Sequence, residues 1–432
     1  MLPVQFAVSN LSLTGYSQLN SMNNYDSIRV ICNQSSALSR SVIDEFLMHY
    51  AARQEGLEKE MDRLLAPFRQ VTKTFQPGWI GMIKAQYIAH RIFRKDGLIK
   101  KYLNHAAVKA LKPAEQDYLQ RQSEFPWRYS YGVITASPAP DFYEMDDVFS
   151  WEPYLLYSPS ITQTLAEEPV SLWFNLIGFN GACWQTFGPI ISFRGFEPDD
   201  IFFFATEINP KIGTEEDLTA DVERNPIPYT MLVNGSQYPY IMNGKDQILQ
   251  LVSEHPLESL DTENLRTDFI VEYSNGIYRL TFGDWAEPPH FAVAYYVEED
   301  HRLLLTSMTD RGFQALVARL NKHGMAIWAE PDIRVNLPML TCVKTILGKE
   351  LHLNPYEEYF SVRPTASEQD SLNKLNRLLS LALPFINSGQ DLDVRALAKE
   401  ADVDEETARE LLSKSIKRVK TLQNKIDKKR KK

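Results

Sequence analysis

The apolar residues of this chain change their spacing near Tyr129, and this change limits the possible folds more than any other feature. From Ser41 to Gln122 they recur every three or four residues, as in helices that bury one face. After Tyr129 they form short apolar and aromatic runs separated by Gly, Pro, Asn and Asp, which is typical of strands and turns. The sequence therefore predicts an α+β protein with a helical N-terminal layer and a central, mostly antiparallel β-rich region.

The length predicts several folding units. A chain of 432 residues exceeds the size at which one hydrophobic core normally divides. We expect a helical region over 1–125, a β-rich domain over 126–260 and an α+β domain over 261–365. A small all-α C-terminal module with a basic tail is expected over 366–432.

The first part of the β-rich region predicts three strands. Segment 171–193 indicates two strands that are joined near Asn180 and Gly181, because this pair favours a tight turn. Segment 199–208 is an apolar and aromatic run, and we expect it to form a third, buried strand.

The next part predicts two hairpins. Segment 267–282 contains Asn275 and Gly276 between β-forming residues, and this pair suits a type I′ turn because both positions need positive φ. Segments 290–297 and 302–307 predict the second hairpin, with an acidic turn between them.

A helix and a strand are expected to follow. Asp310 is the predicted N-cap of the helix, and Gly324 is placed to end it. Four apolar residues at helical spacing form its predicted buried face: Phe313, Leu316, Val317 and Leu320. Segment 325–330 is then expected to return as a strand.

The C-terminus divides into segments of opposite charge. The whole chain has a net charge of -10, yet segment 412–432 carries ten Lys and Arg against one acid, Asp427. Segment 391–411 carries eight acids and three bases. The basic tail is therefore electrostatically distinct from the rest of the chain.

Segment 393–412 has the pattern of a helix-turn-helix. In a DNA-binding protein the start of the second helix approaches the major groove. Here that position carries Asp404, Glu405 and Glu406, which repel phosphates but favour the start of a helix. The pattern therefore favours a protein-docking module or a helical hairpin over a reader of DNA sequence.

The tail predicts an amphipathic basic helix that docks on a protein, binds nucleic acid, lies on a membrane surface or is a solvated end. Its apolar stripe lacks Trp and Phe, so membrane insertion would be weak. We expect a protein partner to contact Leu412, Ile416, Val419, Leu422, Ile426, Lys417, Arg418 and Lys420. The alternative is nucleic acid, for which the predicted contacts are Lys425, Lys428, Lys429, Arg430, Arg91, Arg94, Lys100 and Lys101. In segment 84–105, aromatic residues separate the basic ones, but a solvated helix face has the same pattern.

The sequence contains no catalytic signature, so we expect no catalytic residues and no cofactor. Its three cysteines, Cys32, Cys183 and Cys342, stand far apart and lack the spacing of zinc ligands. Asp284, Glu287 and His290 form a weak candidate for a metal site in one loop, although a loop between strands needs polar residues in any case. A hydrolase built around this loop remains a second alternative function.

Within residues 129–193, the segments Tyr129–Val133, 141–162 and 170–190 follow the order of a strand, an Asp-rich turn, a second strand, a Ser-rich link and a hairpin that ends in Gly. This order resembles that of uncharacterised bacterial proteins that are associated with a SEC-C zinc tail. The cysteine-rich tail itself is absent from this sequence. The resemblance therefore implies a bacterial β-rich module and transfers neither a metal nor an activity.

Together these features predict a non-enzymatic regulatory or adaptor protein that binds a protein partner through its C-terminal module. A nucleic-acid-associated regulator is the first alternative. The sequence has no apolar run of the length that spans a membrane and no pattern of a secretory leader, so we expect a cytoplasmic protein without membrane contact.

Overall fold

A computed structural model gives the fold and describes residues 25–76, 78–167, 170, 172–235, 240–360, 366–388 and 392–413. The chain divides into two compact units, Met1–Asn354 and Pro355–Lys432. Helices and antiparallel sheets occur together, which confirms the α+β class. Among the described residues, no helix has the length and apolar character needed to cross a membrane.

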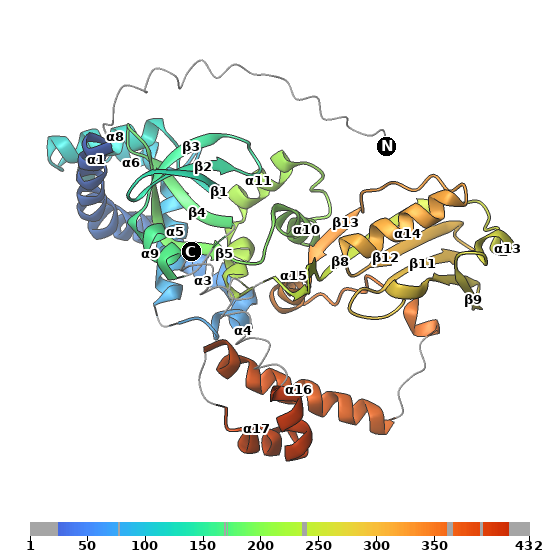
Figure 1. The fold of residues 1–432 in the computed structure, drawn as a ribbon. Coiled ribbons are helices and arrows are strands. Elements are labelled where there is room, and N and C mark those ends of the chain that lie inside the picture. Colours follow the sequence, from blue (N-terminus) through green and yellow to red (C-terminus); the bar gives the residue numbers. More distant parts are fainter. Residues whose placement is uncertain are drawn as a thin grey trace. The chain divides into compact units, whose positions relative to one another are not determined.

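The N-terminal helices form the first layer of the larger unit (Figure 1). Val42, Leu47 and Ala51 are fully buried in it, and Gly56 ends a helix in the left-handed conformation with φ of 67°. The longer helices are α1 (Tyr25–Leu38), η1 (Ser39–Leu47), α2 (Met48–Glu55), α3 (Leu57–Leu65), α5 (Trp79–Phe93) and α8 (Pro113–Glu124). Short helices between them are η2 (Ala66–Phe68), α4 (Arg69–Thr72), α6 (Ile99–Leu103) and α7 (Ala106–Lys109).

A five-stranded closed barrel follows, with the strand order β1-β2-β3-β5-β4. Its strands are β1 (Arg128–Ala139), β2 (Phe142–Asp147), β3 (Pro153–Tyr157), β4 (Leu172–Phe179) and β5 (Trp184–Phe193). The predicted hairpin around Asn180 and Gly181 is confirmed, since β4 and β5 pair antiparallel. Helix α9 (Pro159–Glu167) connects β3 to β4.

The helices and the barrel share one hydrophobic core. Phe174 of β4 is fully buried, and its ring stacks on Tyr129 and Tyr131 with centroid distances of 5.1 and 4.4 Å. On the other side, the ring of Tyr129 contacts His90 of α5 at 4.8 Å. The predicted division at 125/126 therefore lies inside a continuous core, and does not separate two units.

The third predicted strand, 199–208, is wrong, because this segment belongs to helix α10 (Pro198–Ile208). Pro198 stands at the first position of the helix, and the backbone N–H of Glu197 donates to the Asp200 carboxylate at 2.8 Å. These N-terminal signals favour a helix over the strand preference of the phenylalanines. Further helices are α11 (Glu215–Arg224), α12 (Pro226–Thr230) and η3 (Met231–Gly235).

A six-stranded antiparallel sheet completes the fold of the larger unit, in the order β13-β8-β12-β11-β10-β9. The strands are β8 (Leu249–Pro256), β9 (Ile270–Ser274), β10 (Ile277–Thr281), β11 (Ala292–Val297), β12 (Arg302–Ser307) and β13 (Ile333–Asn336). Both predicted hairpins are confirmed, and Asn275 and Gly276 have φ of 52° and 77°. The predicted boundary at 260/261 is wrong, because β8 pairs with β12 and β13 within this sheet.

Helix α14 (Asp310–Lys322) packs against this sheet through the four predicted apolar residues (Figure 1). Its N-cap is Thr309 and not Asp310, because the Thr309 hydroxyl accepts the N–H of Gly312 at 3.1 Å. Segment 325–330 is not a strand. The Asn321 side chain accepts the N–H of Ile327 at 2.8 Å and donates to its C=O at 3.0 Å. These two backbone groups therefore cannot form hydrogen bonds with a neighbouring strand.

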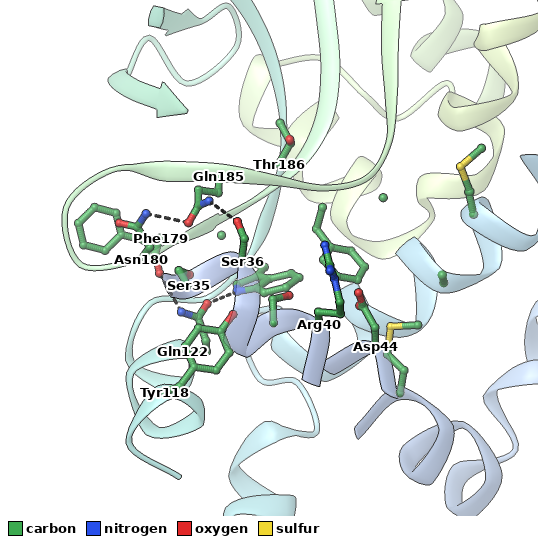
Figure 2. A pocket seen from close by; sticks show the side chains of 18 residues that line it. Ser35, Ser36, Arg40, Asp44, Tyr118, Gln122, Phe179, Asn180, Gln185 and Thr186 are labelled. Carbon is green, nitrogen blue, oxygen red and sulfur yellow. Dashed lines mark hydrogen bonds between the residues drawn. The ribbon is translucent and has the colours of Figure 1, made fainter. Parts of the chain in front are cut away.

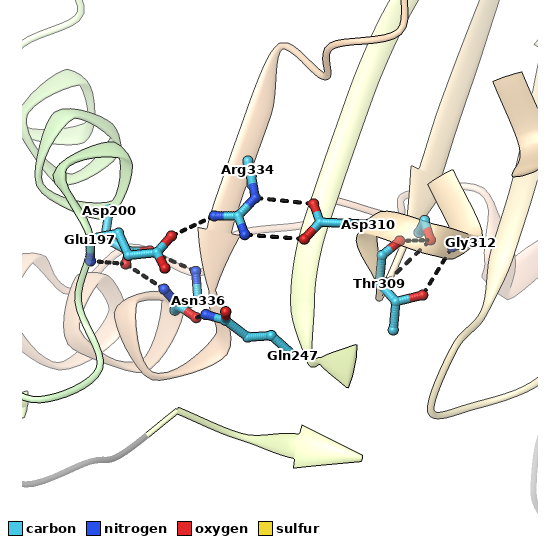
Figure 3. A network of polar contacts seen from close by, with 9 residues as sticks. Glu197, Asp200, Gln247, Thr309, Asp310, Gly312, Arg334 and Asn336 are labelled. Atoms are coloured by element: carbon cyan, nitrogen blue, oxygen red, sulfur yellow. Dashed lines mark hydrogen bonds and ion pairs between the residues drawn. The ribbon is translucent and has the colours of Figure 1, made fainter. Parts of the chain in front are cut away.

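Ion pairs and hydrogen bonds link α10, α14 and β13 (Figure 3). The Arg334 guanidinium donates to Glu197 at 2.6 Å and twice to Asp310 at 3.1 Å. Beside it, the buried Asp200 carboxylate accepts the backbone N–H of Asn336 at 2.6 Å and its side-chain amide at 2.5 Å. The sheet is thus connected by polar contacts to the helix that follows the barrel.

The remaining described elements of the larger unit are short. They are β6 (Met242–Asn243), β7 (Asp246–Gln247), α13 (Thr262–Leu265), η4 (Gly283–Trp285), α15 (Leu337–Cys342) and η5 (Val343–Leu347).

The smaller unit contains η6 (Glu357–Tyr359), α16 (Ala366–Ser388), α17 (Val394–Ala401) and a helix over 405–413. The two helices predicted within 393–412 are confirmed, and Asp402 makes the turn between them with φ of 57°. Leu397, Ala401 and Ala408 are buried in a core that α16 shares. The Asp404 side chain accepts the N–H of Glu406 at 2.9 Å, as expected for an acid that starts a helix.

Candidate ligand cavity

A cavity of about 470 Å³ lies among α1, η1, α5, α8 and the β4–β5 hairpin (Figure 2). This volume is in the range of small-molecule sites. Its lining combines hydroxyl, amide and aromatic groups with one cation, Arg40, and one anion, Asp44. No His, Cys or Lys is among the lining residues, so the cavity offers groups for binding and few groups for acid–base chemistry.

The charged part of the lining lies on the π-helix η1. Ser39, Arg40 and Asp44 all come from this element, and single turns of π-helix occur frequently at functional sites. Neither the Arg40 side chain nor the Asp44 side chain makes a hydrogen bond or a close ion pair with another described residue. Burial raises the pKa of Asp44, while the charge of Arg40 opposes this increase. The cavity thus presents a positive and a negative group that are both available to a ligand.

Trp127, an aromatic residue of the lining, is held in place by a hydrogen bond and by close packing. The Trp127 indole N–H donates to Gln122 at 2.6 Å, and the Gln122 amide donates to the C=O of Phe179 at 3.1 Å. Gly178 lies so close to the indole that a Cβ atom there would come within 2.5 Å of its nitrogen. A glycine is therefore needed for the indole to pack against β4.

Hydrogen bonds connect α1 to the barrel at the edge of the cavity (Figure 2). The Gln185 amide donates to Ser36 at 3.1 Å, and the Asn180 amide donates to Gln185 at 2.8 Å. Tyr118 adds a buried hydroxyl, and burial raises its pKa to about 12. This hydroxyl therefore remains protonated near neutral pH and can donate a hydrogen bond to a ligand.

Sequence reasoning missed these residues. Arg40 and Asp44 stand in a helical stretch without any motif, and their partners in the cavity come from strands more than a hundred residues later. The structure also brings Cys32 and Cys183 together, with 3.3 Å between the sulfur atoms, although 151 residues separate them in the sequence. Sequence spacing carries no signal for such a contact.

The basic residues predicted for nucleic acid in segment 84–105 do not form a free cationic surface. Arg91 lies 3.4 Å from the Glu60 carboxylate, and Lys101 lies 2.5 Å from Glu55. Arg94 donates to the C=O of Glu223 at 3.2 Å, while Lys100 is exposed. Neighbouring acids therefore neutralise the charges of Arg91 and Lys101, whereas a contact of Arg94 and Lys100 with phosphates stays a prediction.

The candidate metal residues Asp284, Glu287 and His290 do not form a metal site. No group of three or more His, Cys, Asp or Glu in the described part of the chain is placed to hold a metal ion. The His290 ring instead packs edge-on against Trp285 at 4.7 Å, and its Nε2 lies 3.3 Å from the Asn243 amide. His290 therefore has structural contacts, and the three residues predicted as the centre of the hydrolase alternative are not placed as metal ligands.

Most of the predicted C-terminal contact residues lie outside the described residues. This holds for Ile416, Val419, Leu422, Ile426, Lys417, Arg418, Lys420, Lys425, Lys428, Lys429 and Arg430. Leu412 is described and is fully buried in the core of its own module. It therefore supports the module from inside, which corrects its predicted role as a contact residue.

No family model matches this chain, and no curated protein or solved structure matches it. The resemblance of residues 129–193 to SEC-C-associated proteins stays a prediction.

Proposed function

We propose that this chain is a non-enzymatic regulatory protein that binds a small zwitterion of the amino-acid class in the cavity. The observation that carries the proposal is the pair Arg40 and Asp44, whose opposite charges are both available at the same cavity. A guanidinium suits a carboxylate, and a carboxylate suits an ammonium group. The hydroxyls and amides around them suit an uncharged polar or aromatic remainder of the ligand.

The test is calorimetric titration of the full chain with a panel of free L-amino acids. Each amino acid that binds is compared with its carboxamide and with its N-acetyl form. We expect Arg40→Gln to weaken binding of the free amino acid about tenfold but to leave binding of the carboxamide unchanged. Asp44→Asn should show the reciprocal pattern, with the N-acetyl form unaffected.

Arg53→Gln is the matched control, because Arg53 is an exposed arginine on α2 outside the cavity lining. It should leave all affinities unchanged. The proposal is wrong if no amino acid binds, or if Arg53→Gln weakens binding as much as Arg40→Gln does.

We further propose that the C-terminal module binds a protein partner with an acidic surface. This proposal is supported by the basic segment 412–432 and by exposed apolar side chains on α16. Leu372 and Leu383 are each 48% exposed, and Phe385 is 38% exposed.

The partner proposal predicts the outcome of an affinity purification from the native cell. A protein should be enriched by the full chain and lost with a chain that ends at Gly389, and the purified pair should bind directly. Binding that involves the apolar side chains should survive moderate salt. Enrichment of nucleic acid that salt removes would favour the alternative regulator instead.

A further inference from the structure

Two buried thiols lie side by side in the larger unit, although they are 151 residues apart in sequence. Cys32 belongs to α1, and Cys183 belongs to the turn between β4 and β5. Their sulfur atoms are 3.3 Å apart, and both cysteines are free. A disulfide needs the two sulfurs about 2 Å apart, so only a small approach separates this pair from a covalent bond.

The turn holds Cys183 in place. The Asn180 side-chain oxygen accepts the N–H groups of Ala182 and Cys183 at 2.8 and 2.9 Å. Its amide nitrogen donates to the sulfur of Cys32 at 3.3 Å and approaches that of Cys183 at 3.6 Å. One side chain thus shapes the turn and contacts both thiols.

The thiol pair lies directly behind the edge of the ligand cavity. Asn180 and Gln185 both line the cavity, and the Gln185 amide donates to the C=O of Cys32 at 3.2 Å and to Ser36 at 3.1 Å. Asn180 therefore contacts both sulfurs and also lines the cavity, so the thiol pair and the cavity share this side chain. Both sulfurs belong to the elements that form this edge.

We propose that Cys32 and Cys183 form a reversible disulfide by exchange with a small disulfide of the glutathione class. The disulfide links α1 covalently to the β4–β5 turn and restricts the motion of these two elements at the edge of the cavity. The consequence for ligand exchange rests on the proposed function, whereas formation of the bond does not.

The exchange takes two steps. The Cys32 thiolate attacks one sulfur of the small disulfide, expels the other half as a thiolate and forms a mixed disulfide. The Cys183 sulfur then loses its proton, attacks the Cys32 sulfur and expels the second half. The protein loses two electrons and two protons, and the small disulfide is reduced to two thiols.

The order of the two cysteines follows from their surroundings. The hydrogen bond from Cys183 lowers the pKa of Cys32, and the Asn180 amide and the charge of Arg29 act in the same direction. The hydrogen bond to Cys32, together with burial, raises the pKa of Cys183. Cys32 is therefore the attacking thiol and Cys183 the resolving thiol.

The test is peptide mapping of the full wild-type chain after incubation with oxidised glutathione. Thiols that remain are alkylated in denaturant, and the digest is analysed by mass spectrometry without reduction. We expect a linked Cys32–Cys183 peptide that is lighter than the sum of its parts by two hydrogen atoms. Dithiothreitol should restore both thiols, while Cys342, buried and with a pKa raised to about 12, should be alkylated throughout.

Variants test the order of the steps. Cys183→Ser should trap glutathione on Cys32, whereas Cys32→Ser should leave Cys183 free, and Cys342→Ser should behave as the wild type. The proposal is overturned if the wild-type chain retains three thiols that can be alkylated, or if Cys342 is consumed as fast as the pair.

A separate measurement tests the consequence for the cavity. The dissociation rate of a bound amino acid should fall several-fold when the wild-type chain is oxidised, and should not change in Cys32→Ser. A linked peptide without any amino-acid binding would refute the proposed ligand but keep the disulfide. An amino acid that binds with equal rates in both redox states would refute the effect of the disulfide on the cavity.

Discussion

Phe174→Ala is expected to lower the free energy of unfolding of the larger unit by about 4 kcal/mol. The side chain is fully buried, and its ring stacks on Tyr129 and Tyr131 where the barrel meets the N-terminal helices. Truncation to alanine removes these contacts and leaves a cavity between the barrel and the N-terminal helices. The surrounding side chains can fill this cavity only in part.

Urea unfolding followed by tryptophan fluorescence measures this effect. All seven tryptophans lie in Met1–Asn354, so the signal reports on this unit. Phe125→Ala is the matched control, because Phe125 is 46% exposed, and it should cost about 1 kcal/mol or less. Equal losses for the two variants would contradict a shared core between helices and barrel.

The second prediction concerns the pH dependence of stability and Asp200. Burial raises the pKa of this carboxyl to about 6, although the N–H groups of Asn336 and Glu197 favour its charged form. Between about pH 4 and pH 6 the folded state therefore binds a proton more tightly than the unfolded state does. The stability that Asp200 contributes is complete below about pH 4, and about 3 kcal/mol of it is lost as the pH rises through 6.

Comparison with Asp200→Asn isolates this contribution, because every other carboxyl titrates alike in the two proteins. Urea unfolding of each is measured at several pH values between about 4 and 7. We expect the stability of the wild type minus that of the variant to decrease by about 3 kcal/mol between pH 4 and 6. Parallel curves for the two proteins would show that Asp200 does not titrate in this range.

Local physical chemistry explains which elements the sequence predicted. The turn at Asn275 and Gly276 needs positive φ at both positions, and few other residue pairs accept this. The two C-terminal helices also begin and end on short-range signals, such as the caps at Asp393 and Asp404. The prediction of a strand over 199–208 was wrong because it followed the aromatic run and neglected the helix-starting signals at Glu197, Pro198 and Asp200.

The candidate cavity could not be predicted in the same way. Its charged groups come from η1, while its amides and aromatic rings come from α8, from Trp127 just before β1, and from the β4–β5 hairpin. None of these segments carries a motif, because a binding site made from several elements needs no fixed spacing in any of them. The contact of Cys32 with Cys183 depends on the same long-range packing.

The α+β class, the main hairpins and the helical pair at the C-terminus could be predicted from the amino-acid sequence, because they depend on side-chain periodicity, turns and caps within a few residues. Three features became visible only in the folded chain: helices and barrel share a core, β8 pairs with strands from beyond residue 300, and two distant thiols meet. These features follow from which buried surfaces fit together, and this complementarity is a property of the packed chain that short segments do not encode.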